Sequence, residues 1–132
     1  MLITRETDYA VRTVLFLAMR RDGVANAREI AETMRIPGSF LAKILQRLVR
    51  RGLVKSTRGA RGGFSLARPP SRISLFTIME AIQGPAGINS CAVNGARCGL
   101  SRSCAVHPVW VGIRRNVEAR LKRETIAKLM RR

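Results

Sequence analysis

Apolar residues recur every three or four positions in several stretches of the chain, and this spacing is typical of amphipathic helices. A first helix is predicted from Thr4, which can cap it, to about Arg20. Its apolar positions are Val11, Val14, Leu15 and Ala18. Asn26 and Glu29 then have the spacing of a capping box, which predicts the start of a short second helix.

A third helix is predicted within FLAKILQRLVRRG, residues 40–52, after a brief turn. One of its faces is apolar and carries Leu41, Ile44, Leu45 and Leu48. The opposite face has no acidic residue and carries Ser39, Ala42, Lys43, Gln46, Arg47 and Arg50. This is the pattern of a helix-turn-helix, whose second helix lies in the major groove of DNA. It predicts that the base-edge or groove contacts come from Ser39, Lys43, Gln46 and Arg47.

The next stretch predicts a basic β-hairpin. LVKST and GGFSLA, residues 53–57 and 62–67, have the composition of two short strands, and the glycines between them permit a tight turn. Arg58 and Arg61 are predicted at the tip, from where they can reach phosphates or a narrow minor groove. A hairpin in this place after a recognition helix is typical of a wing. Another helix is predicted over LFTIMEAIQG, residues 75–84.

A last helical stretch is predicted from Pro108 to the end of the chain, with an apolar stripe of Trp110, Ile113, Val117 and Leu121. No other element is left in the chain to cover this stripe, so a subunit interface is expected there. The predicted fold is therefore mainly α with a small β wing. It comprises a winged helix-turn-helix DNA-binding domain over residues 1–83, a cysteine-rich loop over residues 84–107 and a long C-terminal dimerisation helix over residues 108–132.

Charge narrows the class of partner. The 25 Lys and Arg residues against 8 Asp and Glu give a net charge of +17, which favours a polyanion: nucleic acid first, an anionic membrane surface second. Between Arg35 and Arg72 there are ten basic residues and no acidic one, which concentrates the charge in the predicted DNA-binding domain. No apolar run is long enough to span a membrane, and the charged N-terminus does not resemble a signal peptide, so a cytoplasmic protein is expected.

All three cysteines and the single histidine lie within one segment, with the spacing Cys91-x6-Cys98-x5-Cys104-x2-His107. The segment has few apolar residues to bury, so a bound metal could supply its ordering free energy. Zinc suits three thiolates and an imidazole, although structural zinc sites usually contain a closer cysteine pair. An iron–sulfur cluster suits the wide gaps better. The alternative is that these are ordinary packed or surface residues without a ligand.

Several stretches of the chain carry a family resemblance: ITRETDYAVR, IAETMRIPGSFLAKILQRLVRRGLVKSTRGARGGFSLA, and AIQG followed by three spaced cysteines, the last of which begins CAVHPVW. Together they resemble the winged-helix regulators of the Rrf-two superfamily, which includes the IscR-like and NsrR-like iron–sulfur regulators. The resemblance covers nearly the whole chain. It implies a homodimeric transcription factor that binds double-stranded operator DNA under the control of an iron–sulfur cluster. The cluster would respond to redox state, nitric oxide, or iron and cluster supply.

The resemblance also implies a ligand set. Cys91, Cys98 and Cys104 match the three thiolate ligands, although the first gap is one residue longer here than in the IscR-like pattern. His107 matches the fourth ligand of IscR-like proteins, which implies [2Fe-2S]. Asp8 matches the carboxylate that NsrR-like proteins supply across the dimer, which implies [4Fe-4S]. Asp8 can instead pair with Arg12, four residues further along the first helix.

Two other functions compete with this one. A zinc-stabilised DNA-binding protein would use the cysteines for structure alone, without sensing. An iron–sulfur enzyme is disfavoured because neither a carboxylate pair nor a nucleophile and base are evident, so no catalytic residue and no small-molecule substrate is expected.

Overall fold

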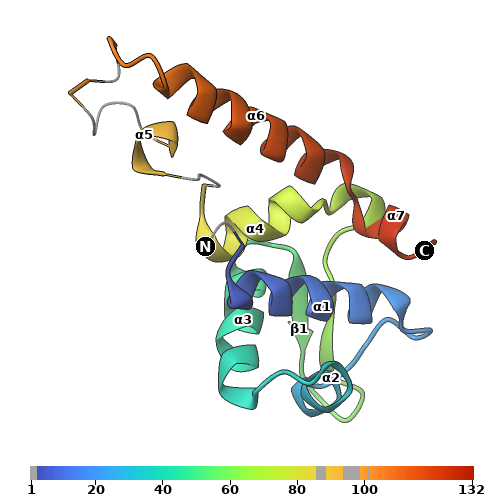
Figure 1. The fold of residues 1–132 in the computed structure, drawn as a ribbon. Helices are drawn as coiled ribbons and strands as arrows, with labels where there is room; N and C mark the ends of the chain where they lie inside the picture. The colour runs from blue at the N-terminus through green and yellow to red at the C-terminus, as the bar shows by residue number, and fades with distance from the viewer. Residues whose placement is uncertain (1–2, 86–88, 94–98, 101) are drawn as a thin grey trace.

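The computed structural model describes residues 3–85, 89–93, 99–100 and 102–132. The elements follow one another as α1 (Arg5–Met19), α2 (Ala27–Met34), α3 (Gly38–Arg50), β1 (Val54–Thr57), β2 (Gly63–Leu66), the short 3-10 helix η1 (Pro70–Arg72), α4 (Leu75–Gln83), α5 (Ser90–Val93), α6 (His107–Arg123) and α7 (Ile126–Leu129). The prediction of a mostly helical chain with one small hairpin is confirmed (Figure 1).

The first three helices form a helix-turn-helix on a shared core. Thr4 caps α1 by accepting the backbone N–H of Thr7 on its side chain, and Asn26 and Glu29 make the predicted capping box at the start of α2. α2 ends at Arg35, whose φ of 54° turns the chain into α3. The buried side chains of α3 are the four that the periodicity predicts, Leu41, Ile44, Leu45 and Leu48. They pack into one core with residues of α1, α2 and α4.

The wing is an antiparallel pair of strands, and a backbone bridge from Ala25 joins its second strand to the segment before α2. β1 and β2 pair from Val54 with Leu66 to Thr57 with Gly63. Ala25, just before α2, pairs with Phe64 as an isolated bridge, with N–H to carbonyl distances of 3.0 and 2.7 Å. Gly63 is required at this contact, because its φ is +151° and a Cβ there would lie 2.7 Å from the carbonyl oxygen of Ala25.

The C-terminal segment differs from the prediction of one helix running to the end. α6 stops at Arg123, and α7 turns back onto the DNA-binding domain, where Ile126 is fully buried. Thr125 caps α7 by accepting the backbone N–H of Lys128, and its backbone pairs with Ser74. The physical reason for the break is therefore a local N-cap combined with a place for one apolar side chain in the core.

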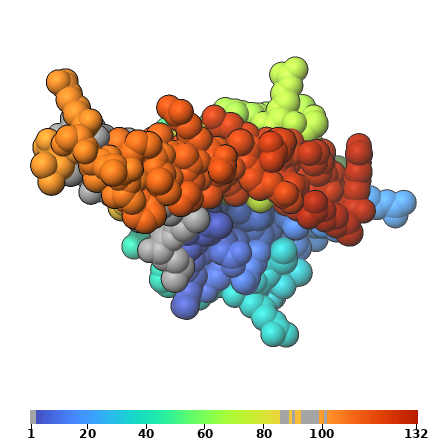
Figure 2. Space-filling view, turned by 45° about the horizontal axis from the view of Figure 1, so that its top comes forward, coloured from blue at the N-terminus to red at the C-terminus, as the bar shows by residue number. Residues whose placement is uncertain are grey.

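α6 lies across the molecule on the side opposite the wing and crosses α4 (Figure 1). Its N-terminal end extends beyond the body of the domain, together with α5 (Figure 2). No residue of α6 is fully buried, and Val109 and Ile113 keep exposures of 53% and 38%. Of the predicted apolar stripe, Trp110, Val117 and Leu121 are partly buried and Ile113 is exposed, so the chain covers this stripe only in part. Among the described residues, no helix is both long and apolar enough to cross a membrane.

Candidate DNA interface and cysteine segment

The exposed face of α3 carries the residues predicted to contact DNA. Ser39, Lys43, Gln46 and Arg47 are all exposed, while the buried side chains of the same helix fix its orientation on the core. The helix begins after Pro37 and has no acidic residue in any turn. A rigid helix with one buried apolar face and one exposed polar, basic face can enter a major groove.

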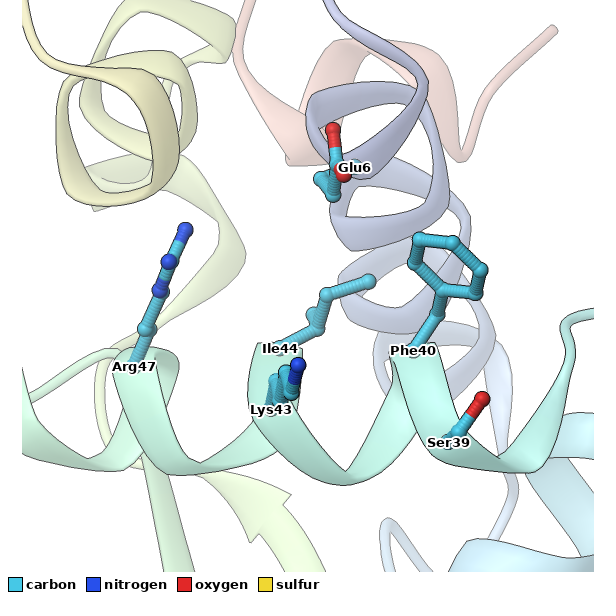
Figure 3. A pocket seen from close by; sticks show the side chains of 6 residues that line it. All are labelled: Glu6, Ser39, Phe40, Lys43, Ile44 and Arg47. Carbon is cyan, nitrogen blue, oxygen red and sulfur yellow. The ribbon is translucent and has the colours of Figure 1, made fainter.

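A hollow of about 190 Å³ opens beside this helix, where the N-terminal turn of α1 meets α3. Its lining residues are Glu6, Ser39, Phe40, Lys43, Ile44 and Arg47 (Figure 3). Glu6 is the one acidic residue in this lining, and its place beside α3 is not predicted from the sequence. It belongs to another helix, so no spacing within the helix-turn-helix motif could have indicated it.

Arg47 is exposed, yet its side chain is directed toward α4 (Figure 3). Its Nη1 donates a hydrogen bond of 3.0 Å to the backbone carbonyl of Ile82 in the last turn of α4. In this position the guanidinium group joins two helices of the domain, which the sequence periodicity did not predict.

The wing carries its two arginines where they were expected. Arg58 and Arg61 lie in the turn between β1 and β2, and both are exposed. Gly62 in the same turn allows a close approach of the backbone, because a Cβ there would collide with the carbonyl oxygen of Thr57. The turn is therefore compact, with cationic side chains at its surface.

The distribution of ion pairs leaves the surface of α3 and the wing cationic. Six of the eight carboxylates are in ion pairs, namely Asp8, Asp22, Glu29, Glu32, Glu118 and Glu124. Their partners are arginines of α1, α2, α6 and the segments next to them. Within the described part of the chain, none of the ten basic residues between Arg35 and Arg72 takes part in an ion pair. This stretch therefore keeps its full positive charge for a polyanion.

The cysteine segment is described in part. Cys91 lies in α5 and Cys104 just before α6, both as free, partly exposed thiols, whereas Cys98 lies outside the described residues. His107 is the first residue of α6, and its backbone N–H donates to the carbonyl of Cys104 at 3.3 Å. The Nδ1 atom of His107 is buried and has no hydrogen-bond partner among the described residues.

α5 is held against α6, which keeps Cys91 at the same end of the molecule as Cys104. Nη1 of Arg114 donates to the carbonyl of Ala92 at 2.9 Å, and the same guanidinium group pairs with Glu118 at 3.0 Å. The thiol of Cys91 donates to Oδ1 of Asn89 at 3.3 Å. Across the residues that the structure describes, no three histidine, cysteine or acidic side chains gather as a metal site.

Asp8 lies on α1, where its Oδ2 accepts from Nη2 of Arg12 at 2.8 Å. The same arginine donates to the carbonyl of Met34 at 3.4 Å and lies over the ring of Tyr9, 5.5 Å from its centroid. Tyr9 in turn makes an edge-to-face contact with Phe40 of α3, with 6.1 Å between ring centroids. Asp8 is thus connected through Arg12 and Tyr9 to the start of the recognition helix.

The comparisons with known proteins agree with this architecture. The Rrf2 family, described as "Iron-dependent Transcriptional regulator", matches residues 3–132. A putative HTH-type transcriptional regulator of Aquifex aeolicus is 33% identical over 132 residues, which cover 98% of this chain and 92% of that protein. The HTH-type transcriptional regulator NsrR of Bacillus subtilis is 33% identical over 111 residues, 83% of this chain and 76% of that protein.

Two solved structures have the same fold. T. potens IscR superposes with a TM-score of 0.80 at 25% identity, covering 99% of this chain and 87% of that chain. CymR, titled the global cysteine regulator of B. subtilis, has a TM-score of 0.80 at 25% identity, covering 98% of this chain and 96% of that chain. The winged-helix fold and the family resemblance predicted from the sequence are both confirmed. The chain therefore belongs to the Rrf2 family of transcriptional regulators, and it is a DNA-binding regulator, not an enzyme.

Proposed function

We propose that this protein is a homodimeric, sequence-specific regulator whose operator binding is controlled by an iron–sulfur cluster held on the cysteine segment. In the proposed complex, α3 enters the major groove and the wing reaches the adjacent minor groove or backbone of double-stranded DNA. Ser39, Lys43 and Gln46 are the base-edge candidates of α3, and Arg58 and Arg61 of the wing are the phosphate or minor-groove candidates. The unpaired positive charge between Arg35 and Arg72 supports this mode of binding.

The second subunit in this proposal covers the exposed apolar residues at the N-terminal end of α6. Val106, which caps the helix, and Val109 and Ile113 within it are exposed, and their spacing of three and four residues places them on one side. A two-fold pair of such helices would bury these side chains and present two recognition helices to a palindromic operator, with half-sites separated by about 34–36 Å or a multiple of it.

The buried, unpartnered Nδ1 of His107 is the observation that carries the cluster proposal. A buried polar atom without a partner is costly, and a bound metal would satisfy it. The backbone of His107 is hydrogen-bonded to that of Cys104, whose thiol, like that of Cys91, is free. Soft thiolate ligands with an imidazole or a carboxylate suit an iron–sulfur cluster. Cys91, Cys98 and Cys104 would hold it, with His107 or Asp8 as fourth ligand, and it would supply an inorganic core that reacts with oxygen or nitric oxide.

The two candidates for the fourth ligand have different consequences in this chain. His107 would keep the whole ligand set at the start of α6. Asp8, supplied from the other subunit, would have to leave its ion pair with Arg12, and Arg12 contacts both the end of α2 and Tyr9. A ligand exchange at Asp8 would therefore change the contacts of Arg12 with the helix-turn-helix.

A second candidate function is a regulator that responds to thiol metabolism without a cluster. The relative titled the global cysteine regulator has the same fold over 98% of this chain, and Cys91 and Cys104 are free thiols. A zinc-stabilised regulator that does not sense is the third candidate.

Purification without oxygen, followed by visible absorption and assays for iron, acid-labile sulfide and zinc, separates these functions. A coloured protein with iron and sulfide that binds operator differently before and after nitric oxide treatment is the expected result. One zinc per chain in a colourless protein contradicts the cluster, and a metal-free protein that still responds to thiol reagents supports the second candidate. The variants His107→Ala and Asp8→Asn then identify the fourth ligand by which of them loses iron.

A further inference from the structure

The last turn of α4 is hydrogen-bonded to two other helices of the DNA-binding domain. The carbonyl of Ile82 accepts Nη1 of Arg47 from α3 at 3.0 Å. Oε1 of Gln83 accepts the backbone N–H of Thr4 at 3.0 Å and Oγ1 of Thr7 at 2.6 Å. One turn of α4 therefore joins the recognition helix to the N-terminus of α1.

The bond from Arg47 fits the chemistry of a helix end. Carbonyls in the last turn of a helix have no partner within that helix and carry partial negative charge. α4 ends at Gln83 with Gly84 as its C-cap, so the carbonyl of Ile82 is one of these groups. A guanidinium donor makes the bond charge-assisted and therefore stronger than a neutral hydrogen bond of the same length.

The same turn leads directly into the cysteine segment. Gly84 and Pro85 follow Gln83, and Cys91 comes eight residues after it. α6, which begins at the far end of that segment, packs against α4. A change in the cysteine segment that displaces the end of α4 also displaces the acceptor of Arg47.

We propose that Arg47 is a positioning residue that couples the cysteine segment to the recognition helix through the last turn of α4. This inference rests on the proposed function, because it concerns how the state of the cysteine segment reaches DNA. With the bond made, α3 is fixed to α4 one turn away from Lys43; with the bond broken, α3 loses this attachment and its orientation in the major groove changes. Arg47 then acts on specificity without touching a base.

The first test compares the response of four proteins to a chemical change in the cysteine segment. Metal-free full-length wild type, Arg47→Met, Arg47→Lys and Arg50→Met are measured on DNA selected by the wild type from a random library, before and after alkylation of the thiols with iodoacetamide. Allosteric couplings commonly change affinity by about 5- to 150-fold, so wild-type affinity should change by at least about fivefold.

Arg47→Met should lose this response, because methionine keeps the apolar stem but has no donor. Arg47→Lys should recover part of it, since one ammonium N–H is enough for a single carbonyl. Arg50→Met, which removes an exposed charge from the same helix, should bind more weakly but keep the response. A response of Arg47→Met equal to that of wild type overturns the inference, and so does a changed base preference of Arg47→Met with the response intact, which would make Arg47 a base-reading residue.

Hydrogen exchange provides a readout that does not depend on DNA. Peptides covering the end of α4 and the middle of α3 should exchange faster in Arg47→Met than in wild type or Arg50→Met. Equal exchange in all three proteins overturns the positioning role. If wild-type affinity does not respond to alkylation, the coupling of the thiols to the recognition helix is overturned, whereas the cluster proposal is judged separately by the iron and sulfide assays; the exchange rates still decide whether Arg47 fixes the end of α4.

Discussion

The backbone N–H of Ile126 donates a 2.8 Å hydrogen bond to the carbonyl of Ile73, so the last helix of the chain is attached to the segment between the wing and α4. Leu75 returns a second bond, its N–H donating to the carbonyl of Glu124 at 2.9 Å. Residues that follow α6 in the chain thus complete the DNA-binding domain.

Replacing Ile126 by alanine should therefore destabilise the whole DNA-binding domain. Truncation of a fully buried isoleucine costs about 2–5 kcal/mol through lost burial and the cavity left behind. Urea unfolding monitored by circular dichroism measures this change. Val49→Ala, at a 37% exposed position of α3, is the matched control and should cost much less. Equal stabilities of Ile126→Ala and wild type would show that the C-terminal helix does not contribute to the fold.

The close approach of Gly63 to Ala25 predicts a wing that tolerates no side chain at this position. Gly63→Ala should displace β2 from Ala25 and cost more than about 1 kcal/mol, because both the φ of +151° and the 2.7 Å contact are unfavourable. Unfolding free energy and operator affinity should both fall. Gly112→Ala in α6 has no atom within 4 Å of the added Cβ and should be neutral or slightly stabilising. If Gly112→Ala lost stability and Gly63→Ala did not, the role of the close contact between Gly63 and Ala25 would be contradicted.

The wing and the recognition helix should contribute differently to DNA binding. Arg58→Ala removes a cation at the wing tip, so binding should weaken on all sequences and the dependence of log K on log salt should become shallower by about one unit. Lys43→Ala removes a side chain from the exposed face of α3 and should change which sequences are preferred. Titrations on operator and scrambled DNA at several salt concentrations measure both effects. Equal losses for both variants on every sequence would contradict this division.

The apolar stripe of α6 should hold two subunits together. Ile113→Glu introduces a charge among the exposed apolar residues of the stripe and should shift sedimentation from dimer to monomer, because burying an unpaired carboxylate is unfavourable. Circular dichroism should stay helical, since Ile113 is not part of the core. Ala119→Glu, at an exposed position six residues further along the same helix and therefore on another side of it, is the control and should remain dimeric. Persistence of the dimer in Ile113→Glu would place the interface elsewhere.

The helix-turn-helix and the wing could be predicted from the sequence because each rests on a local pattern. The four buried leucine and isoleucine side chains of α3 recur with helical period, and the capping box before α2 needs only Asn26 and Glu29. In such segments burial and local hydrogen bonding favour the same structure.

Other features depend on contacts that no local pattern carries. Ile126 lies between basic residues that continue the composition of α6, so its return to the core could not be read from periodicity. Arg47 has the helical position of a groove contact, yet its acceptor is a backbone carbonyl 35 residues away. Glu6 borders the hollow beside α3 because α1 packs against α3, which is a tertiary relationship. In the cysteine segment, the structure shows a buried Nδ1 of His107 without a hydrogen-bond partner among the described residues, which the sequence did not indicate. The ligand set stays a prediction.

The ion pairs have a consequence for assembly. Because most carboxylates are already satisfied by arginines of their own chain, a second copy meets a surface with few negative groups to offer it. Two such chains repel each other over distances comparable to the Debye length, about 10 Å at 0.1 M salt. DNA phosphates carry the opposite charge, so DNA binding should lower the repulsion between the two subunits of the proposed dimer.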